Sequence, residues 1–350
     1  MTIEAGDRFV LSHARPKRMT ERMLTPALIF VLVMLAPLSL MIGHAALSPG
    51  DILSGLRGEG TAAIILYEIR LPRLMLAMMV GGMLGLSGAA LQGFLRNPLA
   101  EPAIFGAPQA AALGAVIVLY SGLTSAVSYA LPLAAIAGAL GSILLVFLIA
   151  GTQAHLVTMI LSGLAVSSLA GAATSLVINL SPNPFAVTEI VFWLMGSFED
   201  RSMRHVALAL PFILVSGALL LRCGGGYRAL TLGEDVARTL GVNMKRLRWI
   251  TIGASACGIG AGVAVSGAIG FVGLVAPHLA RPFVGADPQR VLVPSGLIGA
   301  ALLTAADILV RLVPATSEIK VGVVTALIGV PMFLYLVASR RGFLGPGEAA

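Results

Sequence analysis

The sequence is poor in charge and almost free of cysteine. Charged residues make up 11% of its 350 positions, whereas about 25% is usual in a soluble domain. So few charges cannot cover a water-exposed surface, which excludes a soluble multidomain enzyme. Hydrophobic residues make up 57%, which excludes a chain that stays disordered in water. Cys223 and Cys257 are too few for a disulfide framework and are interpreted as small apolar residues.

Catalytic motifs are also missing. The phosphate-binding loop of many ATP-hydrolysing proteins needs a lysine soon after a glycine, at the start of a helix. The three lysines, Lys17, Lys245 and Lys320, follow Pro, Met and Ile instead. Neither His-Glu-x-x-His nor Cys-x-x-Cys occurs, so no metal site is expected. We therefore expect no catalytic residue and no cofactor, and we expect that the chain is not an enzyme.

Long apolar runs are abundant instead, and the mean hydropathy is +0.95. A helix needs roughly 20 apolar residues to cross the ~30 Å apolar core of a bilayer. The sequence therefore predicts an all-α integral membrane protein with about ten transmembrane helices. One run is short enough to form a re-entrant or tilted helix, namely 271–285. The predicted spans are 25–46, 71–93, 104–122, 127–150, 156–180, 203–221, 248–268, 271–285, 290–310 and 320–338.

Two pairs of glycines predict how some of these helices meet. Gly81 and Gly85 have the small-xxx-small spacing, as do Gly258 and Gly262. Small residues at this spacing let two helix backbones approach closely. We interpret both pairs as packing sites, with a hinge or the lining of a translocation path as the alternative.

Basic residues indicate the orientation of the spans. With ten spans, most of the 23 lysine and arginine residues lie on the same side as both termini. Cytoplasmic segments are enriched in these residues, so both termini are predicted to be cytoplasmic. The net charge of +7 then reflects membrane topology, and no nucleic-acid partner is expected. We divide the chain into a cytoplasmic N-terminal tail (1–24), a transmembrane domain (25–342) and a cytoplasmic C-terminal tail (343–350).

Asp307 is the one acidic residue that lies clearly within a predicted span. Arg311 follows on the same helical face, and an acid placed four residues before a base forms a favourable pair. Ionisable residues within a bilayer are costly and usually functional. Two interpretations follow: a self-neutralised pair near the outer surface, or an ion-coupled secondary transporter that uses Asp307.

The long cytoplasmic loop at 222–247 contains the pattern of a short helix. Gly233 would open this helix, and Glu234 and Asp235 lie in its first turn, where carboxylates interact favourably with the helix dipole. Gly241 lies where a glycine commonly ends a helix. The loop is therefore predicted to hold a compact helical element.

This predicted helix is amphipathic. Leu232, Val236 and Leu240 recur at fourfold spacing and give it one apolar stripe. Such a helix binds either the membrane surface or a groove in a partner protein. Its acidic start disfavours anionic lipid, so we favour a protein partner.

At these residues the sequence resembles the permease subunit of ABC importers for iron chelates, haem and cobalamin, the FecCD type. The resemblance covers roughly residues 25–342 and depends on linked motifs that occur in the family's order. They include Glu-Ile-Arg-Leu-Pro-Arg before the second span and Arg-Asn-Pro-Leu-Ala-Glu-Pro after it. The matching stretches are 68–73, 87–92, 96–102, 232–242, 267–278 and 306–331.

The resemblance implies a type II ABC importer permease in the inner (plasma) membrane of a bacterium. It implies a homodimer, in which each copy binds one cytoplasmic ABC ATPase subunit, and a periplasmic substrate-binding protein that delivers the cargo. The commonest cargo of the family is a ferric siderophore, with haem and cobalamin as alternatives. A receptor or channel without coupled energy is a further alternative to an importer.

The resemblance also implies roles for particular residues. Arg70, Arg73 and Arg311 match the arginines that dock the binding protein, and each lies at the outer end of a predicted span. The alternative is that these side chains snorkel to the membrane interface. The helix in the cytoplasmic loop matches the coupling helix, which lies in a groove of the ATPase. Its residues are Gly233, Glu234, Asp235, Val236, Ala237, Arg238, Leu240 and Gly241.

One stretch departs from the family pattern. After Glu101 and Pro102 the family usually has a glycine, a small polar pair and another glycine. Here Pro108 and Gln109 replace the small polar pair. Because this stretch opens the third predicted span, we expect its helix start or its path surface to differ.

Overall fold

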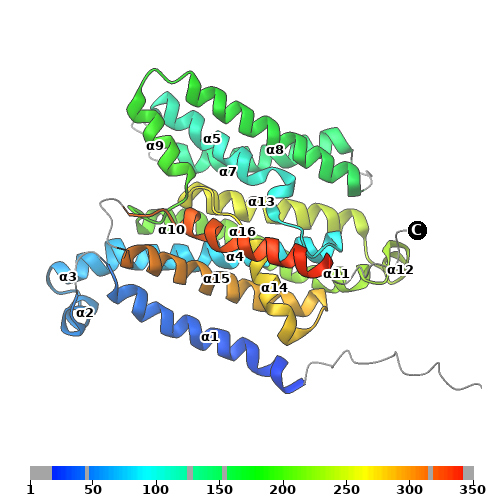
Figure 1. The fold of residues 1–350 in the computed structure, drawn as a ribbon, viewed down its shortest axis with the longest axis horizontal. Helices are drawn as coiled ribbons and strands as arrows, with labels where there is room; N and C mark the ends of the chain where they lie inside the picture. Colours follow the sequence, from blue (N-terminus) through cyan, green and yellow to red (C-terminus); the bar gives the residue numbers. More distant parts are fainter. Residues whose placement is uncertain (1–17, 44–46, 124–128, 152–155, 314–317, 342–350) are drawn as a thin grey trace, which may run out of the picture.

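The structure, a computed structural model, describes residues 18–43, 47–123, 129–151, 156–313 and 318–341. All regular elements in these segments are helices (Figure 1). The predicted C-terminal tail and most of the predicted N-terminal tail lie outside the described residues. The elements are α1 (Arg18–Met41), α2 (Pro49–Leu56), α3 (Gly60–Ile64), η1 (Ile65–Arg70), α4 (Leu71–Leu95), η2 (Pro102–Phe105), α5 (Ala107–Ser121), α7 (Ala130–Ala150), α8 (Leu156–Asn179), α9 (Pro184–Leu194), α10 (Met203–Arg222), α11 (Gly224–Leu230), α12 (Glu234–Thr239), α13 (Met244–Ser266), α14 (Val272–Val284), α15 (Pro288–Leu312) and α16 (Val321–Arg341).

Each predicted span corresponds to one helix, and the all-α fold class is confirmed. Among the described residues, 7 helices are long and apolar enough to cross a membrane. The helix α14 has 13 residues, in agreement with the short run at 271–285. The sequence did not predict α9, a short apolar helix between the fifth and sixth spans. The helices that match the predicted spans are α1, α4, α5, α7, α8, α10, α13, α14, α15 and α16.

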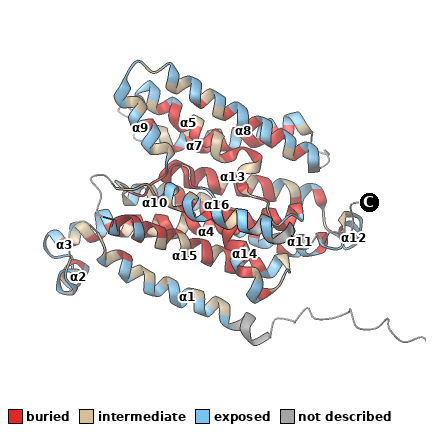
Figure 2. Cartoon of the chain, viewed as in Figure 1, coloured by how far each residue is buried: buried red, intermediate tan, exposed pale blue. Residues whose placement is uncertain are grey.

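The helices pack in layers around α4 (Figure 1). On one side, α5, α7 and α8 form an outer layer, and α10 and α13 lie between that layer and α4. On the other side, α15 and α14 pack on α4, and α1 covers α15. Burial follows this order, because α4, α13 and α15 are largely buried whereas α1, α7 and α8 expose apolar side chains (Figure 2). Those exposed faces suit contact with lipid.

Both predicted glycine pairs lie at helix contacts. A Cβ atom added to Gly81 or Gly85 of α4 would collide with a backbone carbonyl of α15. A Cβ on Gly258 of α13 would collide with Met83 of α4, and Gly262 also faces α4. The packing interpretation therefore describes both pairs, since small residues allow these backbones to approach.

Candidate functional site

The loop at 222–247 contains two short helices, α11 and α12. Tyr227 of α11 is fully buried, and its hydroxyl donates to Thr251 Oγ1 of α13 at 2.9 Å, since Thr251 itself donates to the Leu247 carbonyl. Burial raises the pKa of Tyr227, so the phenol stays protonated as this hydrogen bond requires. The loop is thereby fixed to the transmembrane helices. Neither α11 nor this hydrogen bond was predicted from the sequence.

The second helix, α12, lies where the sequence predicted it. Gly233 and Gly241 flank it with φ angles of 105° and 86°, which a residue with a side chain rarely adopts. The N–H of Gly241 donates to the Arg238 carbonyl at 2.9 Å, and that of Val242 donates to the Ala237 carbonyl at 3.0 Å. These two bonds make a Schellman motif. The helix end is therefore well defined although α12 is short.

Large apolar side chains of this segment project into solvent. Leu232 and Leu240 are each 63% exposed and Val236 is 43% exposed, whereas Ala237 of α12 is buried. The predicted stripe therefore faces outward. The structure places the predicted coupling residues on one protruding element. They are Gly233, Glu234, Asp235, Val236, Ala237, Arg238, Leu240 and Gly241.

An ion pair connects this loop to the start of α15. Arg228 Nη2 lies 2.6 Å from Asp287 Oδ2, and Asp287 also caps α15 by accepting from the N–H of Gln289 at 3.0 Å. Partial burial acts to raise the pKa of Asp287, but its hydrogen bonds to Arg228 and to backbone N–H groups outweigh this and lower it. Displacement of the loop would therefore also pull on the N-terminus of α15.

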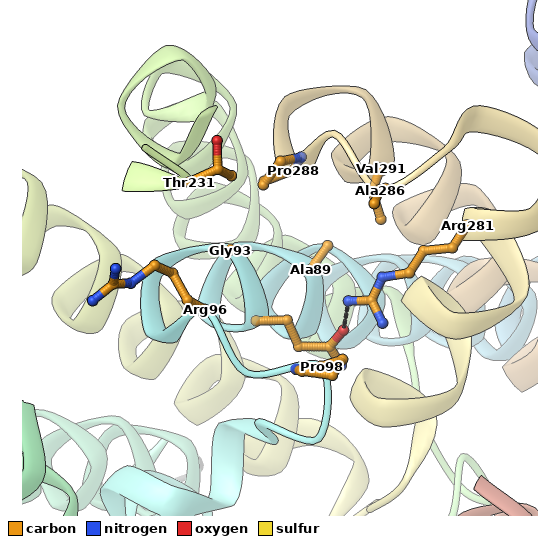
Figure 3. A pocket seen from close by; sticks show the side chains of 10 residues that line it. Ala89, Gly93, Arg96, Pro98, Thr231, Arg281, Ala286, Pro288 and Val291 are labelled. Atoms are coloured by element: carbon orange, nitrogen blue, oxygen red, sulfur yellow. Dashed lines mark hydrogen bonds between the residues drawn. The ribbon is translucent and has the colours of Figure 1, made fainter. Parts of the chain in front are cut away.

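A cavity of about 390 Å³ lies beside this connection (Figure 3). It lies between the last turns of α4, the end of α14, the start of α15 and Thr231. Arg281 of α14 points toward Gln92 of α4 and donates to its side-chain oxygen (Figure 3). The amide nitrogen of Gln92 donates to the Ala100 carbonyl at 3.3 Å. The turn after α4 is thus fixed from the side of the cavity.

At the end of the molecule that was predicted to face outward, Arg73 lies between two carboxylates. Its Nε is 2.9 Å from Asp307 Oδ1, its Nη1 is 3.1 Å from Glu318 Oε2, and its Nη2 contacts both acids. Arg73 is 7% exposed and Asp307 is fully buried. Arg311 Nη2 lies 2.9 Å from the other oxygen of Asp307. Asp307 is therefore held by two guanidinium groups, which matches the interpretation of a self-neutralised pair and extends it.

The arginines also close the C-terminus of α1. The last carbonyls of a helix have no partner within the helix. Arg70 Nη1 donates to the carbonyls of Leu40 and Met41 at 2.5 and 2.9 Å, and Arg311 Nη1 donates to the Ser39 carbonyl at 2.8 Å. Cations at a helix C-terminus also interact favourably with its dipole.

The three arginines predicted to dock a binding protein thus lie together, at exposed fractions of 4%, 7% and 9% for Arg70, Arg73 and Arg311. Their side chains turn inward in the single chain. Neither the internal acid Glu318 nor the closure of α1 was predicted, because these contacts join residues far apart in the sequence. The Glu-Ile-Arg-Leu-Pro-Arg motif alone does not indicate which residues its arginines contact.

The stretch that departs from the family pattern lies beside a groove. Glu101 accepts from the N–H of Phe271 at 2.9 Å, and Phe271 has the left-handed φ of 66° at the start of α14. A small pocket of about 110 Å³ behind this contact is lined in part by Pro108 and Gln109. Phe271 also lines an apolar groove of about 610 Å³, which runs between the end of α9 and α16. The pocket lined by Pro108 and Gln109 therefore shares Phe271 with this groove.

Comparison with known proteins identifies the family that has this architecture. The sequence matches the FecCD transport family over residues 29–339. The chain belongs to the FecCD transport family. It is 43% identical over 285 residues to the cobalamin import system permease protein BtuC of Halobacterium salinarum, which covers 80% of this chain and 75% of that one.

Two further relatives of this FecCD permease carry other names. It is 38% identical to the molybdate import system permease protein MolB of Haemophilus influenzae, over 90% of this chain and 95% of that one. It is 36% identical to the Fe(3+)-citrate import system permease protein YfmE of Bacillus subtilis, over 88% of this chain and 92% of that one. The resemblance inferred from the motifs is confirmed, whereas membership does not select one cargo.

A solved structure agrees with the fold of this FecCD permease. It is described as a metal-chelate type ABC transporter in an inward-facing conformation, and the two chains align with a TM-score of 0.83 at 35% identity. The alignment covers 91% of this chain and 99% of that one. The chain is therefore a multi-pass membrane permease of the ABC transporter class.

Proposed function

We propose that this chain is the permease subunit of an ATP-driven importer that takes up an iron chelate, with a ferric siderophore as its cargo. The observation that carries the proposal is α12: a capped helix with an exposed apolar stripe, fixed to the transmembrane helices through Tyr227. A permease that lacks its own phosphate-binding loop needs such a contact, because the energy must come from another subunit.

The ABC ATPase is the partner proposed for α12. An exposed stripe of large side chains on a cytoplasmic helix fits a hydrophobic groove. Because α12 is also connected to α15 through Arg228 and Asp287, movement of the ATPase would reach the transmembrane helices. The residues proposed to form this coupling helix are Gly233, Glu234, Asp235, Val236, Ala237, Arg238, Leu240 and Gly241.

A second copy of the chain is the partner proposed for the groove beside Phe271. The groove is apolar, and α16 extends its apolar surface with Leu327 at 70% exposure and Leu334 at 60%. Two copies that face each other across α16 would enclose a path at the dimer interface. The Pro108 and Gln109 departure would then lie next to that path.

A periplasmic binding protein is proposed to dock over Arg70, Arg73 and Arg311 at the outer end. The orientation rests on the distribution of basic residues, with both termini in the cytoplasm and the protein in the inner membrane of a bacterium. Relatives named for cobalamin, molybdate and Fe(3+)-citrate support a cargo that contains a metal. We propose the ferric siderophore ahead of haem and cobalamin.

The test is a gentle-detergent pull-down of the tagged chain from its native membrane, with stoichiometry measured by mass spectrometry. We expect one ABC ATPase per permease. The periplasmic binding protein recovered with the complex would then be purified, and its absorption spectrum would distinguish a ferric siderophore from haem and cobalamin. Recovery of the chain alone, under conditions that preserve a control ABC complex, would contradict the proposal.

A transport assay separates this proposal from an ion-coupled carrier. Uptake into proteoliposomes should require ATP and should persist when the proton gradient is abolished. The importer is also consistent with the buried ion pairs of Asp307 with Arg73 and Arg311, which compensate its charge within the chain.

A further inference from the structure

Glu318 differs from Asp307, the other acid that faces Arg73, because it belongs to no helix. It precedes α16, which begins at Val321, and its side chain is only 3% exposed. Its carboxylate contacts both terminal nitrogens of Arg73, with 3.1 Å between Nη1 and Oε2. A carboxylate that pairs with both terminal nitrogens of a guanidinium is the strong form of this interaction.

The two acids that face Arg73 are held in different ways. Asp307 is fully buried within α15 and also pairs with Arg311, so it is a fixed part of the core. Glu318 reaches Arg73 from the segment that leads into α16. Two guanidinium groups thus face two carboxylates, and one of these carboxylates belongs to a segment outside the helices.

The same segment and the first turn of α16 make further contacts. Lys320 Nζ lies 2.5 Å from Glu199 Oε2, and the N–H of Gly322 donates to the Gly196 carbonyl at 3.2 Å. Glu318 adds a contact on the other side, toward α4. Because α16 forms one wall of the groove beside Phe271, these contacts set the position of that wall at its outer end.

We propose that Glu318 is an internal substitute for a carboxylate of the protein that docks at the outer face. In the free permease, Glu318 occupies Arg73. When an acidic surface docks, an incoming carboxylate replaces it on Arg73, and Glu318 moves outward with the start of α16. This inference rests on the proposed docking of a binding protein, and it names the event that connects docking to the groove.

The exchange is physically reasonable because it conserves charge pairing. A buried arginine left without a carboxylate would be strongly unfavourable. Replacement of one carboxylate by another keeps Arg73 paired before and after docking. In addition, internal occupancy lowers the apparent affinity of the partner, since only the fraction of permease with an available Arg73 can bind it.

The central variant is Glu318→Gln in the permease–ATPase complex in nanodiscs. The glutamine keeps the size and an acceptor oxygen, so the fold should persist, as a thermal melt would check. The probe is the periplasmic protein recovered in the pull-down. We expect Glu318→Gln to bind it about tenfold more tightly, as expected when a competing charge is removed from a binding arginine.

Two matched variants separate exchange from a general charge effect. Glu199→Gln removes a negative charge and the Lys320 ion pair but does not touch Arg73, so its affinity should stay within twofold of wild type. Adding Arg73→Gln to Glu318→Gln should abolish the gain. Equal gains in Glu318→Gln and Glu199→Gln, or a gain that persists without Arg73, would overturn the proposal.

A distance measurement on the permease without a docked partner tests the role of Glu318 separately from docking. Spin labels at Ile69 before α4 and Val323 in α16, both exposed positions, report the distance between these elements. Native Cys223 and Cys257 would be replaced first. We expect Glu318→Gln to shift or broaden this distance. An unchanged distance overturns the proposed role of Glu318, whereas wild-type permease that captures no periplasmic protein contradicts the docking proposal alone.

Discussion

At the end of this permease that is proposed to face outward, the side chains of Arg70, Arg73 and Arg311 turn inward and are nearly fully buried. At the end that is proposed to be cytoplasmic, Leu232 and Leu240 turn outward into solvent. Each end thus reverses the usual distribution, in which charge is exposed and large apolar side chains are buried. The reversals have different consequences for the chain.

The outer cluster is satisfied within the single chain. Its arginines have carboxylate or carbonyl partners, and they join α1, α4 and α15. The apolar stripe of α12 faces solvent, so the free energy gained by burying these side chains is available for binding a partner. Removal of an outer charge should therefore affect stability first, whereas removal of a stripe residue should affect assembly first. Substitutions at the two ends test this difference, in order from the largest expected change in the free energy of unfolding to the smallest.

The largest effect is expected from Asp307→Asn. This variant keeps the shape of the side chain but removes the charge that both Arg73 and Arg311 face. Breaking a buried ion pair in this way costs about 3–5 kcal/mol. The free energy of unfolding, measured by denaturant titration in detergent, should fall by this amount. As a control, exposed Asp235→Asn should change it by less than about 0.5 kcal/mol. Equal stability of the two variants would contradict the structural role of the cluster.

Gly241→Val is expected to have an intermediate effect, confined to α12. Its φ of 86° is unfavourable for a β-branched residue by about 1–2 kcal/mol. The Schellman cap should be lost, and ATP hydrolysis should no longer drive uptake in proteoliposomes. Unchanged uptake would count against the role of α12 in coupling.

Gly225→Ala is the matched control in the same loop. Gly225 lies in α11, and no other atom lies within 4 Å of a Cβ at this position. Alanine is also the better helix former. Both uptake and hydrolysis should therefore stay at wild-type levels. If both variants lose coupling, the effect of Gly241→Val cannot be attributed to loss of the Schellman cap, because the loop would then tolerate no substitution.

The contrast between the two ends also explains which features the sequence could predict. The helix α12 depends on local signals: acidic residues in its first turn, an apolar stripe, and Gly241 after its end. All of these lie within about ten residues, so the pattern identified the helix correctly. The apolar spans are local in the same sense, and a helix was found at each.

The partners of the outer arginines are not local. Arg73 meets Asp307 and Glu318 across more than 200 positions of sequence. No periodicity relates these residues, and the family resemblance implied only that the arginines dock a partner. Only the Asp307 and Arg311 pair, one helical turn apart, was recognisable. Tyr227 and α11 were missed for a similar reason, because the partner of Tyr227 lies on α13.

A smaller effect is expected from Tyr227→Phe at the cytoplasmic end. Thr251 keeps its own hydrogen bond to the Leu247 carbonyl at 2.7 Å, so no donor is left unsatisfied when the phenol hydroxyl is removed. The loss should be about 0.5–1.5 kcal/mol, the net value of one hydrogen bond. Tyr67→Phe is the control at the other end of the molecule. Tyr67 is 40% exposed, and its hydroxyl donates to the Leu56 carbonyl at 3.2 Å. A larger loss in Tyr67→Phe than in Tyr227→Phe would contradict the assignment of Tyr227 as the buried attachment of the loop.

The smallest effect on stability is expected from Leu240→Ser. Leu240 is 63% exposed, so its replacement should change the free energy of unfolding by less than about 0.5 kcal/mol. Retention of the ATPase in the pull-down should nevertheless fall by about tenfold, as expected when an apolar anchor is lost from a groove. Thr239→Ala, on the same helix but outside the stripe, should retain the ATPase. A Leu240→Ser variant that is unstable yet still binds the ATPase would mean that the stripe stabilises the single chain. Both ends of the molecule would then serve stability, and the proposed contrast between them would fail.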